Sequence, residues 1–264
     1  MTAVGTTALL PFPTFQMNIT ILRFDALPST NTEALNQAKR GANEGLCVVA
    51  EHQTEGRGRH GRVWISPANA GLYFSIVLRP KLEMRFLPLL TLMSAVAVFD
   101  VLQESYQLNP DIKWANDVLV NDKKICGILA ETAETNLGLA VIVGIGINLQ
   151  SSNFPPELTL IATSIEAETN RTPNPENLLE DLISKLLSYY RILQAENGAK
   201  KIRQEWTHRS TYAFGREVSV VLENEMIFGT TRGIEQNGAL RVETESGEIK
   251  IIHAGDVTKL RKWA

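Results

Sequence analysis

Residues 56–62 read Gly-Arg-Gly-Arg-His-Gly-Arg and are the most informative segment of the chain. The three glycines allow the backbone to approach a ligand closely and to adopt a positive φ. The three arginines offer forked N–H donors that suit phosphate or carboxylate oxygens. The segment is not a Walker A loop, because the Gly-Lys-Ser/Thr ending is absent. It predicts a binding loop for an anionic ligand, and a solvated basic turn or a nonspecific RNA contact is the alternative.

The composition around this loop is that of an ordinary folded protein. Of the 264 residues, 44% are hydrophobic and 21% are charged, and the formal net charge is −3. Because nucleic-acid-binding domains are usually strongly basic, this charge weighs against such a function. The two cysteines, Cys47 and Cys126, lie in apolar stretches and fit a reducing compartment better than a disulfide framework. The four histidines lie far apart, so a zinc site built by the protein is not expected.

The N-terminal residues do not predict a targeting signal. Residues 1–22 carry no charge, and Pro11 and Pro13 interrupt their only apolar patch, unlike a secretory signal or a transit peptide. No apolar run reaches the roughly 18 residues that span a bilayer. We therefore expect a flexible N-terminal tail over residues 1–17, no membrane partner and a cytoplasmic protein.

Helical and strand patterns are mixed between residues 18 and 212, which predicts one α+β domain. Thr30 to Glu33 has the pattern of a capping box, so we expect a short helix from there to about Gly41. Asn121 to Lys124 predicts a hairpin turn. The predicted strands cover residues 18–25, 46–53, 72–79, 112–120, 125–133 and 139–149, and the longer helices cover 86–107, 177–195 and 199–210.

The pattern changes near residue 212. Short strand patterns follow, separated by Glu223-Asn224, Asn237-Gly238 and Ser246-Gly247. Five short strands in about 50 residues predict a small β-barrel. The sequence thus predicts a large domain over residues 18–212 and a barrel over 213–264.

Three more segments carry groups suited to chemistry. Residues 113–117, Lys-Trp-Ala-Asn-Asp, offer a cation, a carboxamide and a carboxylate, or else form a plain strand end with a turn. Lys124 and Glu131 bound an apolar strand and either face a cleft or flank a buried strand. Gly144 and Gly146 interrupt another apolar run. Interior glycine costs about 0.5–1 kcal/mol relative to alanine, so either another group approaches this backbone closely or the strand has a β-bulge.

In order and spacing, these segments resemble the biotin–protein ligase family. The resemblance rests on residues 29–31 (Ser-Thr-Asn), Gln53 with the loop 56–64, the segments 113–117 and 124–131, and residues 144–148. Residues 233–257 resemble the small SH3-like barrel of that family, and the resemblance covers about residues 20–262. It implies an α+β fold, in which a mixed-sheet catalytic domain of the biotin/lipoate ligase type precedes an SH3-like β-barrel.

The resemblance also implies a reaction in two steps. ATP activates biotin to biotinyl-5'-AMP, and biotin then passes to a lysine of the biotin carboxyl carrier protein of acetyl-CoA carboxylase. Mg²⁺ is expected on the phosphates of ATP rather than on protein ligands. Positive charge must offset the repulsion between the two reacting anions, and Arg59 and Lys113 are the expected catalytic residues.

The family's binding residues carry over to matching positions of this sequence. Glycines in the floor of the pocket are expected to leave room for the ring system of biotin. The residues expected to bind biotin are Ser29, Thr30, Asn31, Gln53, Gly56, Arg57, Arg59, Lys113, Gly127, Gly144 and Gly146. The residues expected at ATP or the adenylate are Arg57, Arg59, His60, Arg62, Trp64, Asn116, Lys124 and Asn148.

Two departures and two alternatives accompany the resemblance. His60 stands where the family often has arginine, and no basic recognition helix precedes the catalytic pattern, so we expect a monofunctional ligase without a DNA partner. Whether the chain forms a homodimer is left open. A lipoate or octanoate protein ligase or transferase is the nearer alternative, and Cys126 would then be a candidate nucleophile with no evident base. A noncatalytic nucleic-acid-binding protein is the more distant one.

Overall fold

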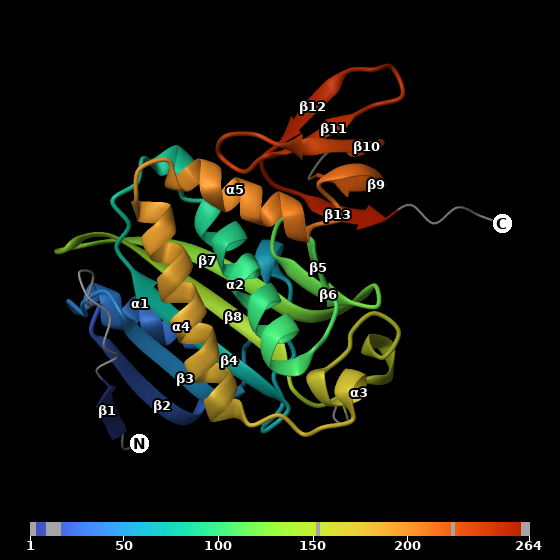
Figure 1. The fold of residues 1–264 in the computed structure, drawn as a ribbon. Coiled ribbons are helices and arrows are strands. Elements are labelled where there is room, and N and C mark those ends of the chain that lie inside the picture. Colours follow the sequence, from blue (N-terminus) through green and yellow to red (C-terminus); the bar gives the residue numbers. More distant parts are fainter. Residues whose placement is uncertain (1–3, 9–16, 152–153, 223–224, 260–264) are drawn as a thin grey trace.

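The computed structural model describes residues 4–8, 17–151, 154–222 and 225–259, which form two sheets with helices around the larger one (Figure 1). The large sheet contains β1 (Val4–Ala8), β2 (Ile19–Leu27), β3 (Leu46–Gln53), β4 (Gly71–Leu78), β5 (Pro110–Lys113), β6 (Asp117–Val120), β7 (Lys123–Thr135) and β8 (Gly138–Asn148). Its strand order is β1-β2-β3-β4-β8-β7-β6-β5. Only the β2–β3 pair is parallel among the described strands, so the sheet is mixed, as predicted.

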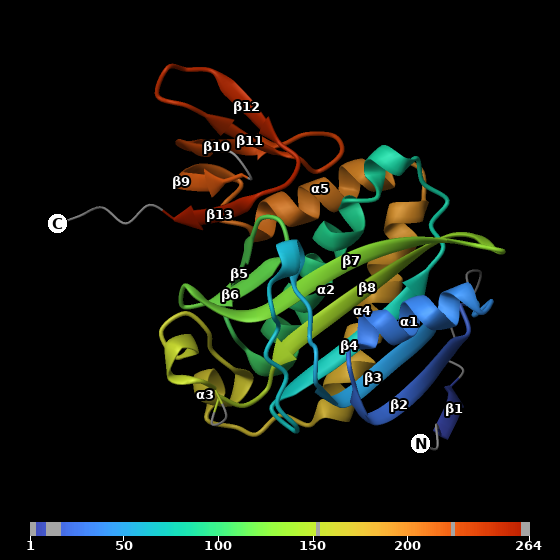
Figure 2. The same cartoon turned by 180° about the vertical axis from the view of Figure 1, so that it is seen from behind.

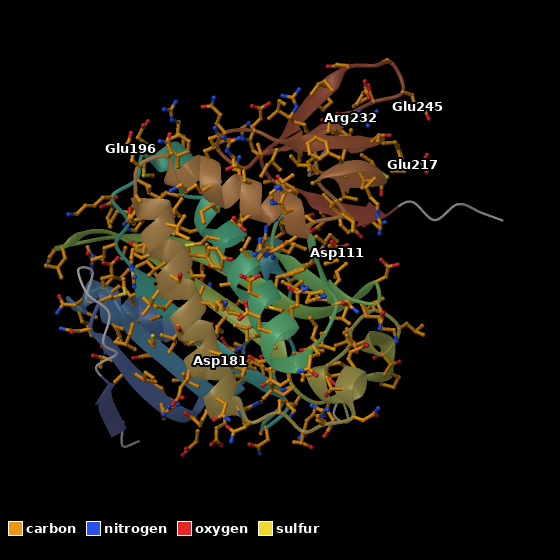
Figure 3. The ribbon with its side chains drawn as sticks, in the orientation of Figure 1. Asp111, Asp181, Glu196, Glu217, Arg232 and Glu245 are labelled. Carbon is orange, nitrogen blue, oxygen red and sulfur yellow. The ribbon has the colours of Figure 1, made fainter. Side chains whose placement is uncertain are left out.

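Helices cover both faces of the large sheet. They are α1 (Thr30–Lys39), α2 (Leu89–Tyr106), α3 (Ile165–Thr169), α4 (Pro175–Gln194) and α5 (Gly198–Arg209), with 3₁₀ turns η1 (Arg59–Gly61), η2 (Met84–Phe86) and η3 (Pro156–Leu158). Figure 1 shows α2, α4 and α5 on one face, and Figure 2 shows α1 on the opposite face. Charged side chains such as Asp181 and Glu196 lie on the outside of this helical layer (Figure 3). The expected α+β domain is therefore confirmed.

The apolar core is centred on α2. Thirteen residues of this helix are buried, because the sheet lies on one side of it and α4 and α5 lie on the other. Together with η2, the helical segment Met84–Tyr106 has the length and composition of a membrane span, with a mean hydropathy of 1.8. The uncharged run itself covers only residues 86–99, between Arg85 and Asp100. Since 78% of this apolar window is buried inside the protein, the segment is the core helix of the domain.

The predicted capping box does not form at the start of α1. Ser29 is the N-cap residue, and its side chain accepts no capping hydrogen bond. The Thr30 hydroxyl instead donates to Oε1 of Gln53 at 3.1 Å, and the Glu33 carboxylate accepts from Gln37. Tertiary partners thus take up both side chains that the capping box would use.

The segment predicted as one strand over residues 112–120 forms two. β5 and β6 pair antiparallel, with Lys113 opposite Asp117, and the residues between them reverse the chain. The next turn agrees with the prediction, because Asn121 and Asp122 have φ values of 53° and 60° and connect β6 to β7. The β5–β6 reversal places the lysine and the aspartate of the 113–117 segment side by side.

The C-terminal part forms five short strands, as predicted. They are β9 (Phe214–Val221), β10 (Met226–Ile234), β11 (Leu240–Glu243), β12 (Ile249–Ile252) and β13 (Asp256–Lys259), in the antiparallel order β12-β11-β10-β9-β13. Gly238 and Gly247 adopt positive φ in two of the predicted turns, and the third, Glu223-Asn224, lies outside the described residues. This small domain packs beside α5, and its Gly238 turn packs on Leu89 and Leu92 of α2 (Figure 1).

The N-terminal residues differ in part from the expected flexible tail. Val4–Ala8 form strand β1, which pairs antiparallel with β2 from Val4 opposite Arg23 to Ala8 opposite Ile19. The rest of the predicted tail before Met17, residues 1–3 and 9–16, lies outside the described residues. Backbone pairing with an edge strand explains the difference, because it requires no particular side-chain pattern.

Candidate active site

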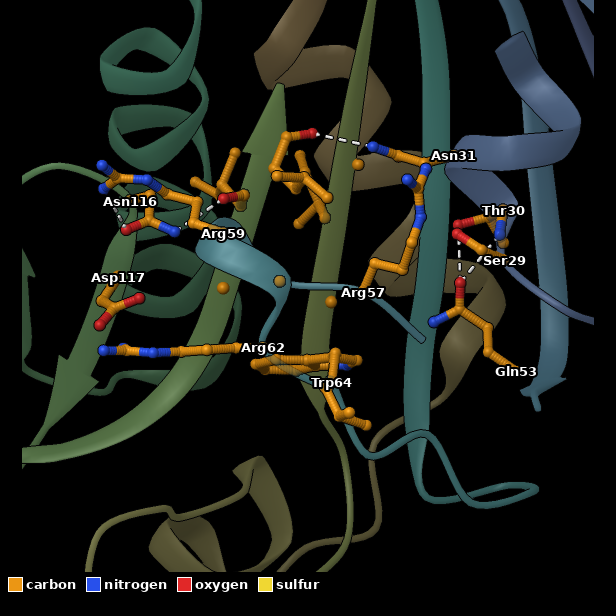
Figure 4. A pocket seen from close by; sticks show the side chains of 18 of the residues that line it. Ser29, Thr30, Asn31, Gln53, Arg57, Arg59, Arg62, Trp64, Asn116 and Asp117 are labelled. Atoms are coloured by element: carbon orange, nitrogen blue, oxygen red, sulfur yellow. Dashed lines mark hydrogen bonds between the residues drawn. The ribbon is translucent and has the colours of Figure 1, made fainter. Parts of the chain in front are cut away.

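A cavity of about 120 Å³ lies between the 54–66 segment and strands β7 and β8 (Figure 4). Segments far apart in the sequence meet there: the start of α1, the end of β3, the arginine–glycine loop, the β5–β6 turn and the two glycine-bearing strands. The predicted site residues that line it are Ser29, Thr30, Asn31, Gln53, Arg57, Arg59, Arg62, Trp64, Asn116, Lys124, Gly127, Gly144 and Gly146. Four predicted residues do not line it, namely Gly56, His60, Lys113 and Asn148.

A rigid polar network forms one end of the cavity. Oε1 of Gln53 accepts from the backbone N–H of Thr30 at 2.8 Å, and its Nε2 donates to the Ser66 hydroxyl at 2.8 Å. The buried Ser75 hydroxyl lies 2.8 Å from Oγ1 of Thr30 and 2.7 Å from Oδ1 of Asn31. These bonds fix which atoms of the wall donate and which accept. Such a wall suits a ligand with paired donors and acceptors, because an unmatched buried polar group costs about 1–3 kcal/mol.

The glycines of the floor are needed for contacts within the protein. A Cβ atom on Gly146 would lie 2.6 Å from the indole of Trp64, and one on Gly127 would lie 2.8 Å from the same ring. At Gly144 the Cβ would lie 2.0 Å from Oδ1 of Asn31. The expectation that these glycines leave empty room for a ligand is therefore corrected. Side chains of the site itself occupy the space, and Trp64 covers the floor.

The arginine–glycine loop, residues 56–62, is a small hairpin. Arg57 bridges Val63, and the N–H of Gly58 donates to the carbonyl of Arg62 at 2.7 Å. The 3₁₀ turn η1 closes the hairpin, with His60 at φ 53° and Gly61 at φ 72°. His60 is exposed at this turn, which explains why it does not line the cavity.

Each arginine of the loop binds a different part of the protein. Arg57 donates to the Glu131 carboxylate on β7 at 2.7 Å, and Arg59 donates to Oδ1 of Asn116 at 3.2 Å. Arg62 forms an ion pair with Asp256 of the C-terminal domain. Figure 4 shows the three side chains spread across the strands below them. The loop is thus closed over the cavity and held at three points.

Lys124, rather than Lys113, supplies the ammonium group of the cavity. Asp117 is buried between the two lysines, 2.6 Å from Nζ of Lys124 and 2.9 Å from Nζ of Lys113. Burial alone would raise the pKa of Asp117, but the two lysines lower it below its usual value. Lys124 lines the cavity and lies 5.3 Å from the centroid of the Trp64 ring. Lys113 does not line the cavity and binds the other oxygen of the Asp117 carboxylate.

Two other predicted residues have roles inside the fold. Asn148 is buried, and its Nδ2 donates to the carbonyl of Thr163 at 2.9 Å and to that of Lys124 at 3.3 Å. It therefore joins β8 to neighbouring backbone. A Cβ atom on Gly56 would lie 2.2 Å from the carbonyl oxygen of Trp64, so this glycine permits the close approach of the two arms of the hairpin.

Arg59 stays charged although it is partly buried. Burial lowers the pKa of Arg59, and the nearby carboxylates of Asp256 and Asp117 oppose this shift. Since the ordinary pKa of arginine exceeds 12, the guanidinium remains protonated. Three guanidinium groups and one ammonium group thus line a small cavity in a chain with a net charge of −3. The arrangement suits a ligand with more than one negative group.

Neither cysteine is suited to nucleophilic catalysis. Cys126 and Cys47 are both fully buried, and burial raises the pKa of each thiol. A protonated, inaccessible thiol is a poor nucleophile. Within the described ranges, no group of three or more His, Cys, Asp and Glu side chains could hold a metal ion.

Comparison with known proteins shows which family the chain resembles. The sequence model described as "Biotin/lipoate A/B protein ligase family" matches residues 23–148, and that of the "Biotin protein ligase C terminal domain" matches residues 213–260. The bifunctional ligase/repressor BirA of Bacillus subtilis is 37% identical over 242 residues, which cover 90% of this chain and 73% of that protein. The biotin–[acetyl-CoA-carboxylase] ligase of Paracoccus denitrificans is 34% identical over 239 residues, which cover 87% of this chain and 96% of that protein.

A solved structure shows the same architecture. The biotin protein ligase of Aquifex aeolicus in complex with biotin and ATP superposes with a TM-score of 0.79 at 30% identity. The match covers 92% of this chain and 99% of that one. With these matches and the cavity between loop and sheet, the chain belongs to the biotin protein ligase family.

Proposed function

We propose that this protein joins biotin to ATP, forming biotinyl-5'-AMP, and then transfers biotin to a lysine of the biotin carboxyl carrier protein of acetyl-CoA carboxylase. The observation that carries the proposal is the convergence of Arg57, Arg59, Arg62 and Lys124 on one cavity that ends in a fixed polar wall. Biotin has both features that such a cavity selects, a ureido group with paired donors and acceptors and a carboxylate at the end of an aliphatic chain.

The polar wall and Trp64 would hold biotin. The ureido group would meet Ser29, Thr30 and Gln53, and neighbouring groups fix the hydrogen-bonding directions of Thr30 and Gln53. The indole of Trp64 provides an apolar surface, and its buried Nε1–H has no hydrogen-bond partner among the described residues.

In the first step, a carboxylate oxygen of biotin attacks the α-phosphorus of ATP. The bond to the β-phosphate breaks, and pyrophosphate leaves. Two anions must come together, so fixed positive charge stabilises the transition state more than the separated reactants. Lys124 and Arg59 are placed for this role, because both line the cavity and both are held by neighbouring side chains, Asp117 and Asn116.

In the second step, the amine of the acceptor lysine attacks the carbonyl carbon of the mixed anhydride. The bond to the phosphate oxygen breaks, AMP leaves, and the amine loses a proton. No enzyme nucleophile is required, which agrees with the burial of Cys126. The closed loop shields the reactive anhydride from water until the acceptor arrives.

Mg²⁺ would accompany ATP rather than occupy a protein-built centre. No acidic or histidine cluster suited to a metal occurs in the part of the chain that the structure describes, while phosphate oxygens and water are usual ligands of Mg²⁺. When bound, the ion would neutralise part of the charge of the leaving pyrophosphate.

We also propose that the catalytic domain spans residues 18–212 and the C-terminal domain residues 213–264. α5 ends at Arg209 and β9 begins at Phe214, so the division falls in the connection between them. A reducing compartment such as the cytoplasm suits both free thiols, Cys47 and Cys126.

One experiment tests the activity. Purified protein is given ATP, Mg²⁺ and either biotin or lipoate, and pyrophosphate exchange and labelling of an acceptor domain are followed. We expect both signals with biotin and neither with lipoate. Exchange that depends on lipoate would replace the proposal with a lipoate ligase, and the absence of exchange with either acid would refute it.

A further inference from the structure

The loop over the cavity is held partly by the second domain. We propose that Asp256 of the C-terminal domain is a positioning residue for biotin activation, because its ion pair with Arg62 keeps the arginine–glycine loop closed over the adenylate. The proposal rests on the proposed ligase function. It assigns the small domain a direct part in the reaction cycle.

The backbone at the start of β13 fixes the position of the Asp256 carboxylate. Asp256 is the first residue of β13 and pairs with Val221 on β9. The preceding Gly255 has φ 151°, and a Cβ atom there would lie 2.8 Å from the side chain of Leu222. Backbone pairing on one side and close packing on the other fix the position of Asp256, which lines the cavity although it belongs to the second domain.

The small domain is itself fixed against the catalytic domain. Nε1 of Trp114 donates to the carbonyl of Gly238 at 2.9 Å. A Cβ atom on Gly238 would lie 2.9 Å from Leu92 of α2, so the β10–β11 turn packs tightly on the core helix. In the connection between the domains, the Ser210 hydroxyl donates to the carbonyl of Ile112 at 2.6 Å. Asp256 is therefore attached to a frame that does not move freely relative to the cavity.

Arg62 differs from the other two arginines of the loop in the domain that it contacts. Arg57 and Arg59 are bound by residues of the catalytic domain, whereas Arg62 is bound by the second domain. Arg62 also precedes Trp64 by two residues on the arm of the hairpin that covers the glycine floor. Loss of the ion pair would free this arm and expose the adenylate to water.

A purely electrostatic role for Asp256 predicts the opposite result. Its carboxylate adds negative charge beside the site that must bind two anions, so its removal alone would favour ATP binding and would not increase loss of adenylate. A positioning role predicts increased loss of adenylate and a more accessible loop. Measuring the KM for ATP and the loss of adenylate in the same variants therefore distinguishes the electrostatic role of Asp256 from the positioning role.

The experiment compares full-length wild type, Asp256→Asn and Asp256→Glu. The first readout is the ratio of AMP released without acceptor to biotin transferred to the acceptor. The second is the rate at which trypsin cleaves after the loop arginines of the ligand-free protein. The matched control is Glu243→Gln, which breaks the Arg232–Glu243 ion pair of the same domain at 2.6 Å; Arg232 lies on the small domain, away from the catalytic domain (Figure 3).

Arg62 is largely exposed, and exposed ion pairs shift an equilibrium by up to about fivefold. We expect Asp256→Asn to raise the AMP ratio and the tryptic rate by about two- to fivefold, Asp256→Glu to restore both, and Glu243→Gln to change neither. High salt should raise both values in the wild type, because it screens the pair.

Wild-type values for Asp256→Asn would overturn the proposal, as would a lower KM for ATP without added loss of adenylate. The tryptic rate needs no substrate. If the wild type showed no biotin-dependent exchange, the proposed ligase function would be refuted. The tryptic rates would still show whether Asp256 anchors the loop.

Discussion

The carboxylate of Asp117 lies 2.6 Å from Nζ of Lys124 and holds this ammonium group against the Trp64 ring, 5.3 Å from its centroid. The same carboxylate binds Lys113 on its other side, at 2.9 Å. One buried anion thus sets the position of the cation that faces the cavity and fixes a second cation behind it. The relationship predicts effects on both stability and catalysis.

Replacing Asp117 with asparagine should destabilise the protein at neutral pH. We expect Asp117→Asn to lower the free energy of unfolding by about 1–3 kcal/mol, because charged hydrogen bonds to two lysines are lost. The pKa of Asp117 is lowered in the folded state. Its contribution is therefore present above pH of about 4, the ordinary value, and is lost only as the pH falls through the lowered pKa. Urea unfolding of both proteins at pH 7, 5 and 3.5 measures this, and a difference that vanished between pH 7 and 5 would contradict the assignment.

The two lysines should differ in their effect on catalysis. Lys124→Gln removes the ammonium group that lines the cavity, so we expect the rate of biotin-dependent pyrophosphate exchange to fall by about 10²-fold or more. Lys113→Gln removes a cation behind Asp117 and should cost less than about tenfold. Exchange rates of both variants at saturating ATP and biotin give the comparison. A larger loss for Lys113→Gln would show that the cavity is built differently in the bound state.

The contact between Gly146 and Trp64 predicts a steric effect. A Cβ atom at residue 146 would lie 2.6 Å from the indole, so Gly146→Ala must displace the ring. We expect the KM for biotin to rise about tenfold or more. Trp64→Ala removes the obstacle, and the double variant should lose less than the sum of the two single losses, as for residues in contact. Additive losses in this double-mutant cycle would mean that the two residues do not meet.

Arg59 should be required to form or retain the adenylate. Arg59→Ala removes a partly buried guanidinium group beside Asn116, and loss of one preorganised donor lowers rates by about 10²–10³-fold. We expect weak pyrophosphate exchange, or exchange with most of the adenylate lost to hydrolysis. The control is Arg85→Ala, because Arg85 is exposed and pairs with its neighbour Glu83 outside the cavity. Equal biotinylation of the acceptor by Arg59→Ala and wild type would refute the role.

Features of the fold that depend on local sequence were predictable. The Asn121-Asp122 turn follows from two residues that tolerate positive φ, and the five strands after residue 213 follow from regularly spaced turns. Predictions failed where a distant partner competes with a local one. The Thr30 hydroxyl bonds to Gln53, 23 positions away, instead of capping α1.

The sequence predicted most of the residues that line the cavity, but not which of their side chains contact each other. Lys113 was expected to be catalytic from its place in the family motif, with Lys124 in support. The chain reversal between β5 and β6, which strand alternation does not reveal, puts both lysines on Asp117, and of the two Lys124 lines the cavity. Asp256 lies 194 positions from Arg62 in another domain, so no spacing in the sequence joins them. The glycines were recognised as sites of close approach, but the sequence does not tell that Trp64 and Asn31 are the approaching groups.

In the proposed reaction, the arginine–glycine loop brings two mutually repelling anions together. The most direct test is a crystal structure of the protein with a nonhydrolysable analogue of biotinyl-5'-AMP. We expect Arg59 and Lys124 to lie within hydrogen-bonding distance of the carbonyl–phosphate linkage, under a closed loop. A structure in which residues 56–62 extend into solvent, away from the bound analogue, would contradict it.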